Sequence, residues 1–250
     1  MAVSIKSARE IELMREAGKR LAHVHQELEA MIAPGISTWE IDAKGEKLIR
    51  DCGCIPNFLH YNGYPASICV SVNDEVVHGI PRKDRYLKEG DIVSLDAGLI
   101  YKGYHSDAAR THAVGKVSTE AQKLMDVTKQ SFFEGIKMAK EGQHLHDISR
   151  AIEEYVTPYG YGIVRDLVGH GIGTALHEDP QIPNYAQKRR GVRLQAGMTI
   201  AIEPMINAGT WQVRFLRDGW TVVTKDGSLS AHYENTILVT DGEPEILTLY

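Results

Sequence analysis

The feature that most constrains the fold of this chain is an internal repeat with a constant offset of 107 residues. The matching pairs are Met31 and Met138, Gly35 and Gly142, Ile41 and Ile148, Gly53 and Gly160, Leu87 and Leu194, and Gly90 and Gly197. A repeated order of helix, turn and strand signals predicts two α+β halves related by an approximate two-fold axis. We expect a single domain over residues 1–250, with repeats at roughly 7–115 and 118–240, since this length can bury one large core.

Helix start signals follow the same repeat. Ser7 with Glu10, and Ser37 with Glu40, have the spacing of a capping box, and apolar residues follow each pair at steps of three and four. The second half offers a third capping box that begins at Thr119, and then a helical pattern after Gly142. We therefore expect four helices, which end near Pro34, near Cys52, near Met138 and after Val156.

Residues 91–107, DIVSLDAGLIYKGYHSD, predict two strands joined at Lys102-Gly103, because apolar and polar residues alternate around a dipeptide that tolerates positive φ. In a hairpin with a two-residue loop, Asp96 faces Ala109 and has Asp107 as a diagonal neighbour on the same sheet face, roughly 7–8 Å away. Two such carboxylates can reach one cation, or one of them can bridge two. Without a cation, burying them would cost more than a domain's whole stability of about 5–15 kcal/mol.

The repeat brings two further acids to this place. The offset puts Asp96 on Glu203, which also follows a glycine turn and an apolar strand face. An insertion of about twenty residues around 209–227 would make Glu234 equivalent to Asp107. The sequence thus predicts four carboxylates at a pseudo-symmetric centre.

A histidine between two glycines, His170 in LVGHGIG, completes a plausible ligand set. The flanking glycines allow the backbone to come close to a ligand. One neutral imidazole and four carboxylates suit two adjacent divalent ions that prefer oxygen donors and accept one nitrogen, such as manganese, iron or cobalt, while zinc is also compatible.

Composition limits the classes of partner. A net charge of −5 argues against a nucleic-acid partner held by charge alone. No apolar run approaches the roughly 20 residues of a membrane span, and the N-terminus lacks the apolar core of a secretion signal. Three cysteines, two of them one residue apart, do not predict a disulfide framework. We expect a cytoplasmic protein that contacts neither membrane nor nucleic acid.

These motifs resemble those of the type I methionine aminopeptidases over essentially the whole chain. The resemblance rests on DAG with a second Asp eleven residues on, GHGIG, TIAIEPM and HYENT. It implies the pita-bread fold, an α+β fold with a central antiparallel sheet covered by helices. It also implies removal of the initiator methionine from nascent polypeptides with a small second residue, and a single catalytic domain. The short chain favours type I over type II, which carries a long insertion.

The resemblance further implies two divalent ions, cobalt, manganese, iron or zinc, and a bridging water that they activate for hydrolysis. Asp96 and Asp107 would hold one ion, His170 and Glu203 the other, and Asp107 and Glu234 would bridge them. Glu203 would accept the water's proton, His177 would stabilise the oxyanion and His78 would lie near the leaving nitrogen. The residues that would line the methionine pocket are Phe58, Tyr61, Tyr64, Cys69, Leu176 and Trp220.

Some residues depart from the family pattern. Leu176 stands where phenylalanine is common, Gly98 where a hydroxyl is frequent and Asn235 where many relatives have histidine; Phe58 and Leu176 could reshape the pocket. We expect His232, which shares a strand face with Glu234, to take no part in the site.

Two alternatives remain beside this interpretation. One is a prolidase or aminopeptidase P of the same fold, which cuts Xaa-Pro bonds. The other is a non-catalytic pita-bread module that binds chain ends or nucleic acid. The expected partners are nascent N-termini near the ribosome exit, and the expected state is a monomer.

Overall fold

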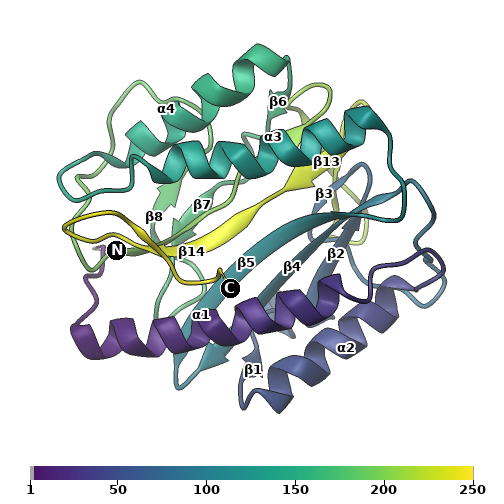
Figure 1. Ribbon diagram of the computed structural model, residues 1–250, viewed down its shortest axis with the longest axis horizontal. Helices are drawn as coiled ribbons and strands as arrows, with labels where there is room; N and C mark the ends of the chain where they lie inside the picture. Colours follow the sequence, from purple (N-terminus) through teal and green to yellow (C-terminus); the bar gives the residue numbers. More distant parts are fainter. Residues whose placement is uncertain (1–2, 250) are drawn as a thin grey trace.

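The computed structural model describes residues 3–249 and contains an antiparallel sheet with two pairs of α-helices. The helices are α1 (Ala8–Glu29), α2 (Thr38–Asp51), α3 (Thr119–Ile136) and α4 (Leu145–Val156), with 3₁₀ turns at Tyr61–Gly63 and Thr157–Tyr159. The strands are β1 (Ile55–Pro56), β2 (Ile68–Val72), β3 (Glu75–Val77), β4 (Ile92–Tyr101), β5 (Tyr104–Ala113), β6 (Gly162–Ile163), β7 (Gly169–Gly171), β8 (Glu178–Ile182), β9 (Thr199–Ile202), β10 (Met205–Asn207), β11 (Val213–Phe215), β12 (Val222–Thr224), β13 (Ser230–His232), β14 (Glu234–Leu238) and β15 (Glu245–Ile246). Figure 1 shows β5 and β14 between the α1/α2 pair and the α3/α4 pair.

Helix starts follow local side-chain chemistry. Ser7 and Ser37 each form the predicted capping box, with Glu10 and Glu40 returning a hydrogen bond to the cap. The predicted third capping box is wrong by one residue, because Ser118, not Thr119, is the cap and its hydroxyl accepts from the Ala121 amide. Ser118 is the N-cap because its extended backbone directs its hydroxyl at the first free amides of α3.

The main sheet has nine strands and its central path is β1-β4-β5-β14-β9-β7-β8, with β2 on β4 and β15 on β14. Every pairing in this sheet is antiparallel. The β4–β5 hairpin has the predicted register: Asp96 pairs with Ala109 and the loop is Lys102-Gly103, both with positive φ. The four acidic residues of the prediction therefore sit on or beside the neighbouring strands β4, β5, β14 and β9.

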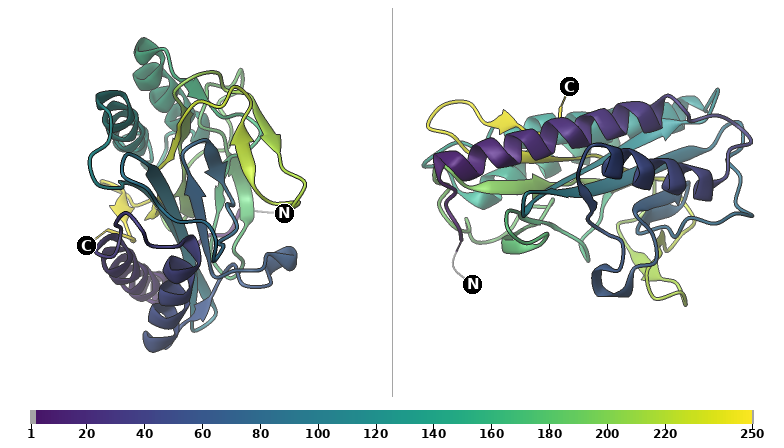
Figure 2. Two further views of the ribbon diagram at one scale, coloured as in Figure 1. Left: turned by 90° about the vertical axis from the view of Figure 1, so that its right-hand side faces the viewer. Right: turned by 90° about the horizontal axis from the view of Figure 1, so that it is seen from below.

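The two faces of β4 differ, as the alternation predicts. Val93, Leu95 and Ala97 pack into a core with residues of α1 and α2. Ser94 and Asp96 have the opposite parity and point away from the helices. In the right-hand view of Figure 2, α1 lies over one face of the sheet, while the segment around β11 and β12 extends from the other. This second face carries the candidate site.

Backbone geometry recurs at the 107-residue offset. Gly35 and Gly142 have φ of 93° and 85°, and Gly90 and Gly197 have φ of 90° and 91°. The isolated bridge between Ser37 and Tyr86 is repeated between His144 and Arg193. Equivalent turns therefore deliver each helix pair to its half of the sheet, which supports an approximate two-fold relation.

The two halves differ where the sequence suggests an insertion. Strands β11 and β12 form a hairpin between residues 213 and 224, and β12 pairs with β3 of the first half. The hairpin brings Trp220 from the second half against Tyr64 of the first, with ring centroids 5.1 Å apart. The insertion thus closes one side of the cleft.

None of the helices within residues 3–249 combines the length and the apolar character that a membrane crossing needs.

A test of this packing is the contact between α1 and the C-terminal segment. A Cβ at Gly18 would lie 2.1 Å from the backbone oxygen of Leu247. Alanine normally stabilises a helix interior by about 1 kcal/mol over glycine. We nevertheless expect Gly18→Ala to lower the free energy of unfolding by about 1–3 kcal/mol in urea titrations, because the backbones must separate. The exposed neighbour Lys19→Ala should change it by less than about 0.5 kcal/mol. A gain for Gly18→Ala would contradict this packing.

Candidate active site

A cleft of about 210 Å³ opens on the sheet face opposite the helices, and every site residue predicted from the sequence lines it. The structure adds Asn62, which no sequence signal had marked. The residues lining the cleft are Phe58, Tyr61, Asn62, Tyr64, Cys69, His78, Asp96, Asp107, His170, Leu176, His177, Glu203, Trp220 and Glu234. The convergence is a fact of geometry, while the individual roles stay predictions.

Adjacent strands position the five predicted ligands. Asp96 lies in the middle of β4 and pairs with Ala109, two residues from Asp107 on β5. Glu234 begins β14 and pairs with Ala109, while Glu203 follows the end of β9 and His170 is central in β7. Because β4, β5, β14, β9 and β7 are consecutive neighbours, five side chains far apart in sequence meet at one point.

The distances are those of atoms that could share an ion. The Nε2 atom of His170 lies 3.8 Å from Oδ2 of Asp107 and 3.7 Å from Oε1 of Glu203. These separations are too long for hydrogen bonds. Ligand atoms of Asp107, His170 and Glu234 lie within 4.8 Å of one another, and so do those of Glu203, His232 and Glu234. Glu234 belongs to both groups, which supports its predicted bridging position.

Burial of the four carboxyl groups makes their ionised forms costly. Burial raises the pKa of Asp96 to about 7. Burial, reinforced by the neighbouring Asp96 carboxyl, holds the pKa values of Asp107 and Glu203 well above their usual range. For Glu234, burial and then the Asp107 carboxyl act in the same direction. The protein alone therefore does not compensate four charges here, and a divalent cation would.

The residues present fit a divalent metal. Buried Oδ1 atoms of Asp96 and Asp107 have no hydrogen-bond partner among the described residues. Nδ1 of His170 donates to the carbonyl oxygen of Gly171 at 2.8 Å, because a carbonyl can only accept, so Nε2 keeps its lone pair and faces the carboxylates. The donor set of oxygens with imidazole suits manganese, iron, cobalt or zinc.

Two more histidines face the cleft. The rings of His177 and His170 lie 4.3 Å apart, and Tyr61 Oη is 2.8 Å from Nδ1 of His177. Burial lowers the pKa of His177, and burial followed by the His177 charge lowers the pKa of His78 to about 4. His78 also has φ of 59°, a conformation that costs a non-glycine residue of order 1–3 kcal/mol and recurs at functional sites.

One wall of the cleft is apolar. Phe58, Tyr64, Cys69 and Leu176 pack in one buried cluster with Trp220 at its edge. The Tyr64 hydroxyl donates to the Gly79 carbonyl oxygen at 2.9 Å, so it presents its ring rather than its hydroxyl. Burial raises the pKa of Cys69 well above its usual value, which keeps it a neutral thiol.

Two departures from the family pattern are coupled in space. A Cβ at Gly98 would lie 3.0 Å from Cε1 of Phe58 and 2.8 Å from Nδ2 of Asn57. A larger residue at position 98 would therefore displace the Phe58 ring. The third departure, Asn235, accepts hydrogen bonds from Arg110 Nη2 at 2.5 Å and Thr248 Oγ1 at 2.9 Å, so it fastens β14 to β5 and to the C-terminal segment.

His232 lies next to the predicted ligands. Its side chain is 2% exposed, and its Nε2 lies 3.8 Å from carboxylate oxygens of both Glu203 and Glu234. The expectation that it takes no part in the site stays a prediction, but among the described residues it belongs to one of the two groups able to hold a metal ion. The available signal was its shared strand face with Glu234, two residues on.

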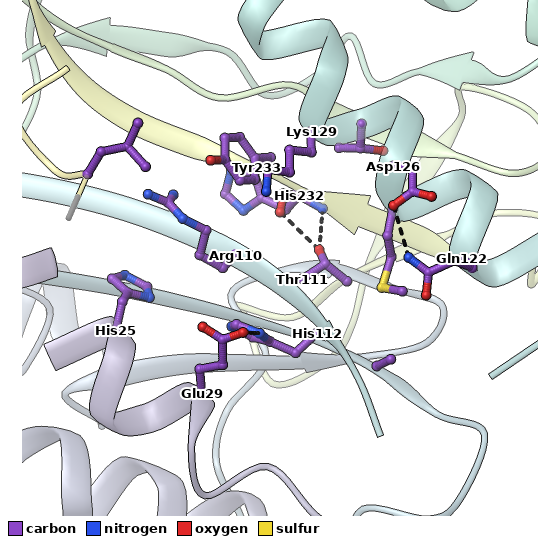
Figure 3. Close-up of a pocket in the computed structure, with 14 residues that line it drawn as sticks. His25, Glu29, Arg110, Thr111, His112, Gln122, Asp126, Lys129, His232 and Tyr233 are labelled. Atoms are coloured by element: carbon purple, nitrogen blue, oxygen red, sulfur yellow. Dashed lines mark hydrogen bonds and ion pairs between the residues drawn. The ribbon is translucent and has the colours of Figure 1, made fainter. Parts of the chain in front are cut away.

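A second cavity, of about 470 Å³, lies on the helix side of the sheet between α1 and α3 (Figure 3). The residues that line it include His25, Arg110, His112 and His232, and none of the residues predicted for the site from the sequence lines it. Burial lowers the pKa of His25 well below its ordinary value and that of His112 to about 4, so both are neutral.

Comparisons with known proteins agree with one another. The model of metallopeptidase family M24 matches residues 12–241. The methionine aminopeptidase of Clostridium acetobutylicum is 53% identical over 99% of each chain. The crystal structure of methionine aminopeptidase from Thermotoga maritima superposes with a TM-score of 0.97, 46% identity and full coverage of both chains. The Xaa-Pro dipeptidase of Bacillus anthracis has a TM-score of 0.79 and 26% identity, and this chain covers only 61% of it. The predicted pita-bread fold is confirmed.

The raised carboxyl pKa values predict how stability varies with pH. Unfolded carboxyl groups lose their protons near pH 4, so above that pH the unfolded state binds fewer protons than the metal-free folded state. We expect the melting temperature of chelated protein to fall between about pH 7 and about pH 8.5, a range above the ordinary pKa of histidine. The free energy of unfolding should fall by up to about 1.4 kcal/mol per pH unit for each proton that unfolding releases. Protein saturated with Mn²⁺ should show little fall, because its carboxylates are ionised when folded. A chelated protein that melts at a constant or rising temperature would contradict the carboxyl assignment.

Proposed function

The chain belongs to metallopeptidase family M24, and on that basis we propose that it is a methionine aminopeptidase, which removes the initiator methionine from polypeptides with a small second residue. The observation that carries the proposal is full-length identity of 53% to a methionine aminopeptidase in a chain whose predicted ligands and pocket residues all line one cleft. The enzyme is a divalent-metal hydrolase that acts on the N-termini of nascent chains.

We propose that the cleft holds two divalent ions. Asp96 and Asp107 would hold one, His170 and Glu203 the other, and Asp107 and Glu234 would reach both. When bound, such ions lower the pKa of water and polarise a carbonyl group, which supplies the nucleophile and electrophile for peptide hydrolysis. The membership of Glu234 in both ligand groups supports a shared carboxylate.

Glu203 is the residue proposed to hold the proton that water gives up. Its backbone is fixed by Asn184, whose Nδ2 donates to the Glu203 carbonyl oxygen at 3.0 Å. The side chain is 14% exposed and thus open to the cleft, unlike the more buried Glu234. A carboxylate at the cleft edge can accept a proton and pass it to the leaving amine.

His177 is proposed to donate a hydrogen bond to the scissile carbonyl oxygen. Its Nδ1 lies 2.8 Å from the Tyr61 hydroxyl, and in the proposed tautomer that hydroxyl donates to Nδ1 while the ring proton is on Nε2. A neutral donor of this kind stabilises the developing oxyanion. His78, also neutral and on the other side of the cleft beside Trp220, would contact the leaving nitrogen.

The apolar wall is proposed to bind the methionine side chain. Aromatic rings and the Cys69 thiol offer the soft contacts that a thioether prefers. Because Phe58 packs against Gly98, the wall is closed there by an aromatic ring. Phe58 and Leu176 together would set the depth of the pocket.

The remaining context is also proposed. We propose that the enzyme works in the cytoplasm near the ribosome exit, where its substrates emerge, as a monomer in which residues 1–250 form one catalytic domain of two repeats. The comparisons favour this function over Xaa-Pro hydrolysis, because the prolidase-type structure is less similar and longer. A non-catalytic module is disfavoured by the retention of all five predicted ligands.

Hydrolysis of a Met-Ala-Ser tripeptide tests the proposal. We expect turnover that a chelator abolishes and Mn²⁺ or Co²⁺ restores, with no cleavage of Xaa-Pro peptides. Asp107→Asn should lower kcat by at least about 10²-fold, because a shared ligand loses its charge. Asp84→Asn, at an exposed carboxylate that pairs with Arg82, should not change kcat. Turnover that survives chelation, or preference for Xaa-Pro, would refute the assignment.

The role of His177 has a separate test. We expect His177→Ala to lower kcat by about 10²–10³-fold with a smaller change in KM, since the hydrogen bond strengthens in the transition state. Tyr61→Phe, which removes only the bond that fixes the tautomer, should give a smaller loss in kcat. Steady-state kinetics on the same tripeptide measures both. An unchanged kcat for His177→Ala would exclude it as the oxyanion donor.

A further inference from the structure

His232 is a buried imidazole that the predicted mechanism does not use. It ends β13, is 2% exposed, and both of its ring nitrogens lack a hydrogen-bond partner among the described residues. Buried polar atoms are normally paired, and leaving one unpaired costs about 1–3 kcal/mol. The position therefore needs an explanation beyond packing.

The surroundings of Nε2 supply that explanation. This atom lies 3.8 Å from Oε2 of Glu203 and 3.8 Å from Oε2 of Glu234. A hydrogen bond would require about 2.7–3.2 Å. Two ligand atoms that each lie about 2.0–2.2 Å from one ion are separated by up to about 4 Å. The three side chains thus have the separations of a ligand group around one cation.

Glu203 stands between two imidazoles in this arrangement. Its Oε1 lies 3.7 Å from Nε2 of His170, and its Oε2 lies 3.8 Å from Nε2 of His232. Each histidine also faces a second carboxylate, Asp107 for His170 and Glu234 for His232. The nitrogen donors are therefore placed in similar ways on either side of one carboxylate.

A threonine hydroxyl holds the backbone of His232, as another threonine hydroxyl holds that of Asp107, a predicted ligand. Thr236 Oγ1 accepts from the Asp107 amide at 3.0 Å and donates to the Asp107 carbonyl oxygen at 2.8 Å. Likewise, Thr111 Oγ1 accepts from the His232 amide at 2.8 Å and donates to its carbonyl oxygen at 2.9 Å. Figure 3 shows the contact between Thr111 and His232.

The backbones of β5 and β14 pair only at Ala109–Glu234 and Ala108–Asn235. In the same register, Thr236 lies opposite Asp107 at one end of this pairing and Thr111 lies opposite His232 at the other. Each threonine hydroxyl takes the place of a direct backbone hydrogen bond between the strands. The Thr236 hydroxyl fixes the backbone of Asp107, and the Thr111 hydroxyl fixes that of His232. Ser94 Oγ, 2.8 Å from Thr111 Oγ1, extends this support to β4. His232 is thus positioned before any ion binds, which favours a ligand over a space-filling residue.

We propose that His232 is a further metal ligand, which binds through Nε2 and forms with Glu203 and Glu234 a nitrogen-containing half of the centre. The proposal deepens the proposed function, since it concerns the same site. A second imidazole shifts ion preference, because nitrogen donors favour zinc, cobalt and iron over manganese and magnesium. Position 232 would thereby set which ion this enzyme retains.

Counting imidazoles on the metal tests the proposal with wild-type protein alone. Metal-free protein is loaded with two equivalents of Zn²⁺ or Co²⁺. X-ray absorption of the zinc form and hyperfine-shifted ring N–H signals of the cobalt form both report coordinated histidines. We expect two imidazoles per protein. A count of one coordinated imidazole per protein would be explained by His170 alone and would overturn the proposal.

A variant pair tests the consequence for affinity. We expect His232→Gln to weaken Zn²⁺ and Co²⁺ binding by about tenfold or more in calorimetry, and Mn²⁺ binding by less, because glutamine retains an oxygen donor. The matched control is His112→Gln, a largely buried histidine on β5 whose Nε2 also lacks a partner but which faces the helices. It should leave all three affinities unchanged.

The outcomes separate this proposal from its alternatives. Equal weakening of all three ions by His232→Gln with an unchanged cobalt spectrum would mean that the residue only supports Glu203 and Glu234, and would overturn the proposal. If the variant fails to fold, the wild-type imidazole count still decides. The count does not depend on peptide hydrolysis, so an inactive protein with two bound imidazoles would refute the proposed function and leave the role of His232 standing.

Discussion

The structure depends on one electrostatic constraint: four carboxyl groups are buried at a single point, and the neighbouring Arg110 lowers the pKa of Glu234 too little to offset that burial. Their pKa values are raised, first by loss of water and then by one another. Such a cluster would destabilise the fold unless a divalent ion supplies the missing charge. The sheet register, the threonine hydroxyls that hold individual backbones and the two supporting helix pairs all serve to keep that arrangement in place. Stability and chemistry are therefore linked through the same ions.

Hydrogen-bond partners, rather than residue type, distinguish the histidines of the cleft. A carbonyl acceptor puts the proton of His170 on Nδ1 and leaves Nε2 to face the carboxylates. The Tyr61 hydroxyl lies 2.8 Å from Nδ1 of His177, and when it donates there the ring proton of His177 is on Nε2. The ring centroids of His170 and His177 are 4.3 Å apart. His170 can thus act as a metal ligand while His177 acts as a hydrogen-bond donor. Neither ring nitrogen of His232 has a hydrogen-bond partner among residues 3–249, and its Nε2 lies 3.8 Å from carboxylate oxygens of Glu203 and Glu234.

The repeat explains why the centre lies where it does, and its imperfection explains the cleft. Equivalent glycine turns and bridges recur at the 107-residue offset, so each half brings an acidic strand to the middle of the sheet. The halves differ by the β11–β12 hairpin, which pairs across to β3 and adds Trp220 to the apolar wall. Most of the apolar wall, including Phe58, Tyr64 and Cys69, comes from the first half, and the insertion adds Trp220 at its edge. The two sides of the site therefore differ.

The sequence by itself determined the starts of α1 and α2, the β4–β5 register and the carboxylates, because capping, alternation and turn chemistry are local and the repeat doubles the signal. It also indicated the pocket residues through resemblance to a family. Only the tertiary structure decided that Ser118 caps α3, that Phe58 occupies the space a side chain at position 98 would need, and that Nε2 of His232 lies 3.8 Å from Glu203 and Glu234. The reason is physical: these features depend on distances between residues remote in sequence. Periodicity assigns a side chain to a face, whereas packing alone decides which atoms on that face come within reach of one ion.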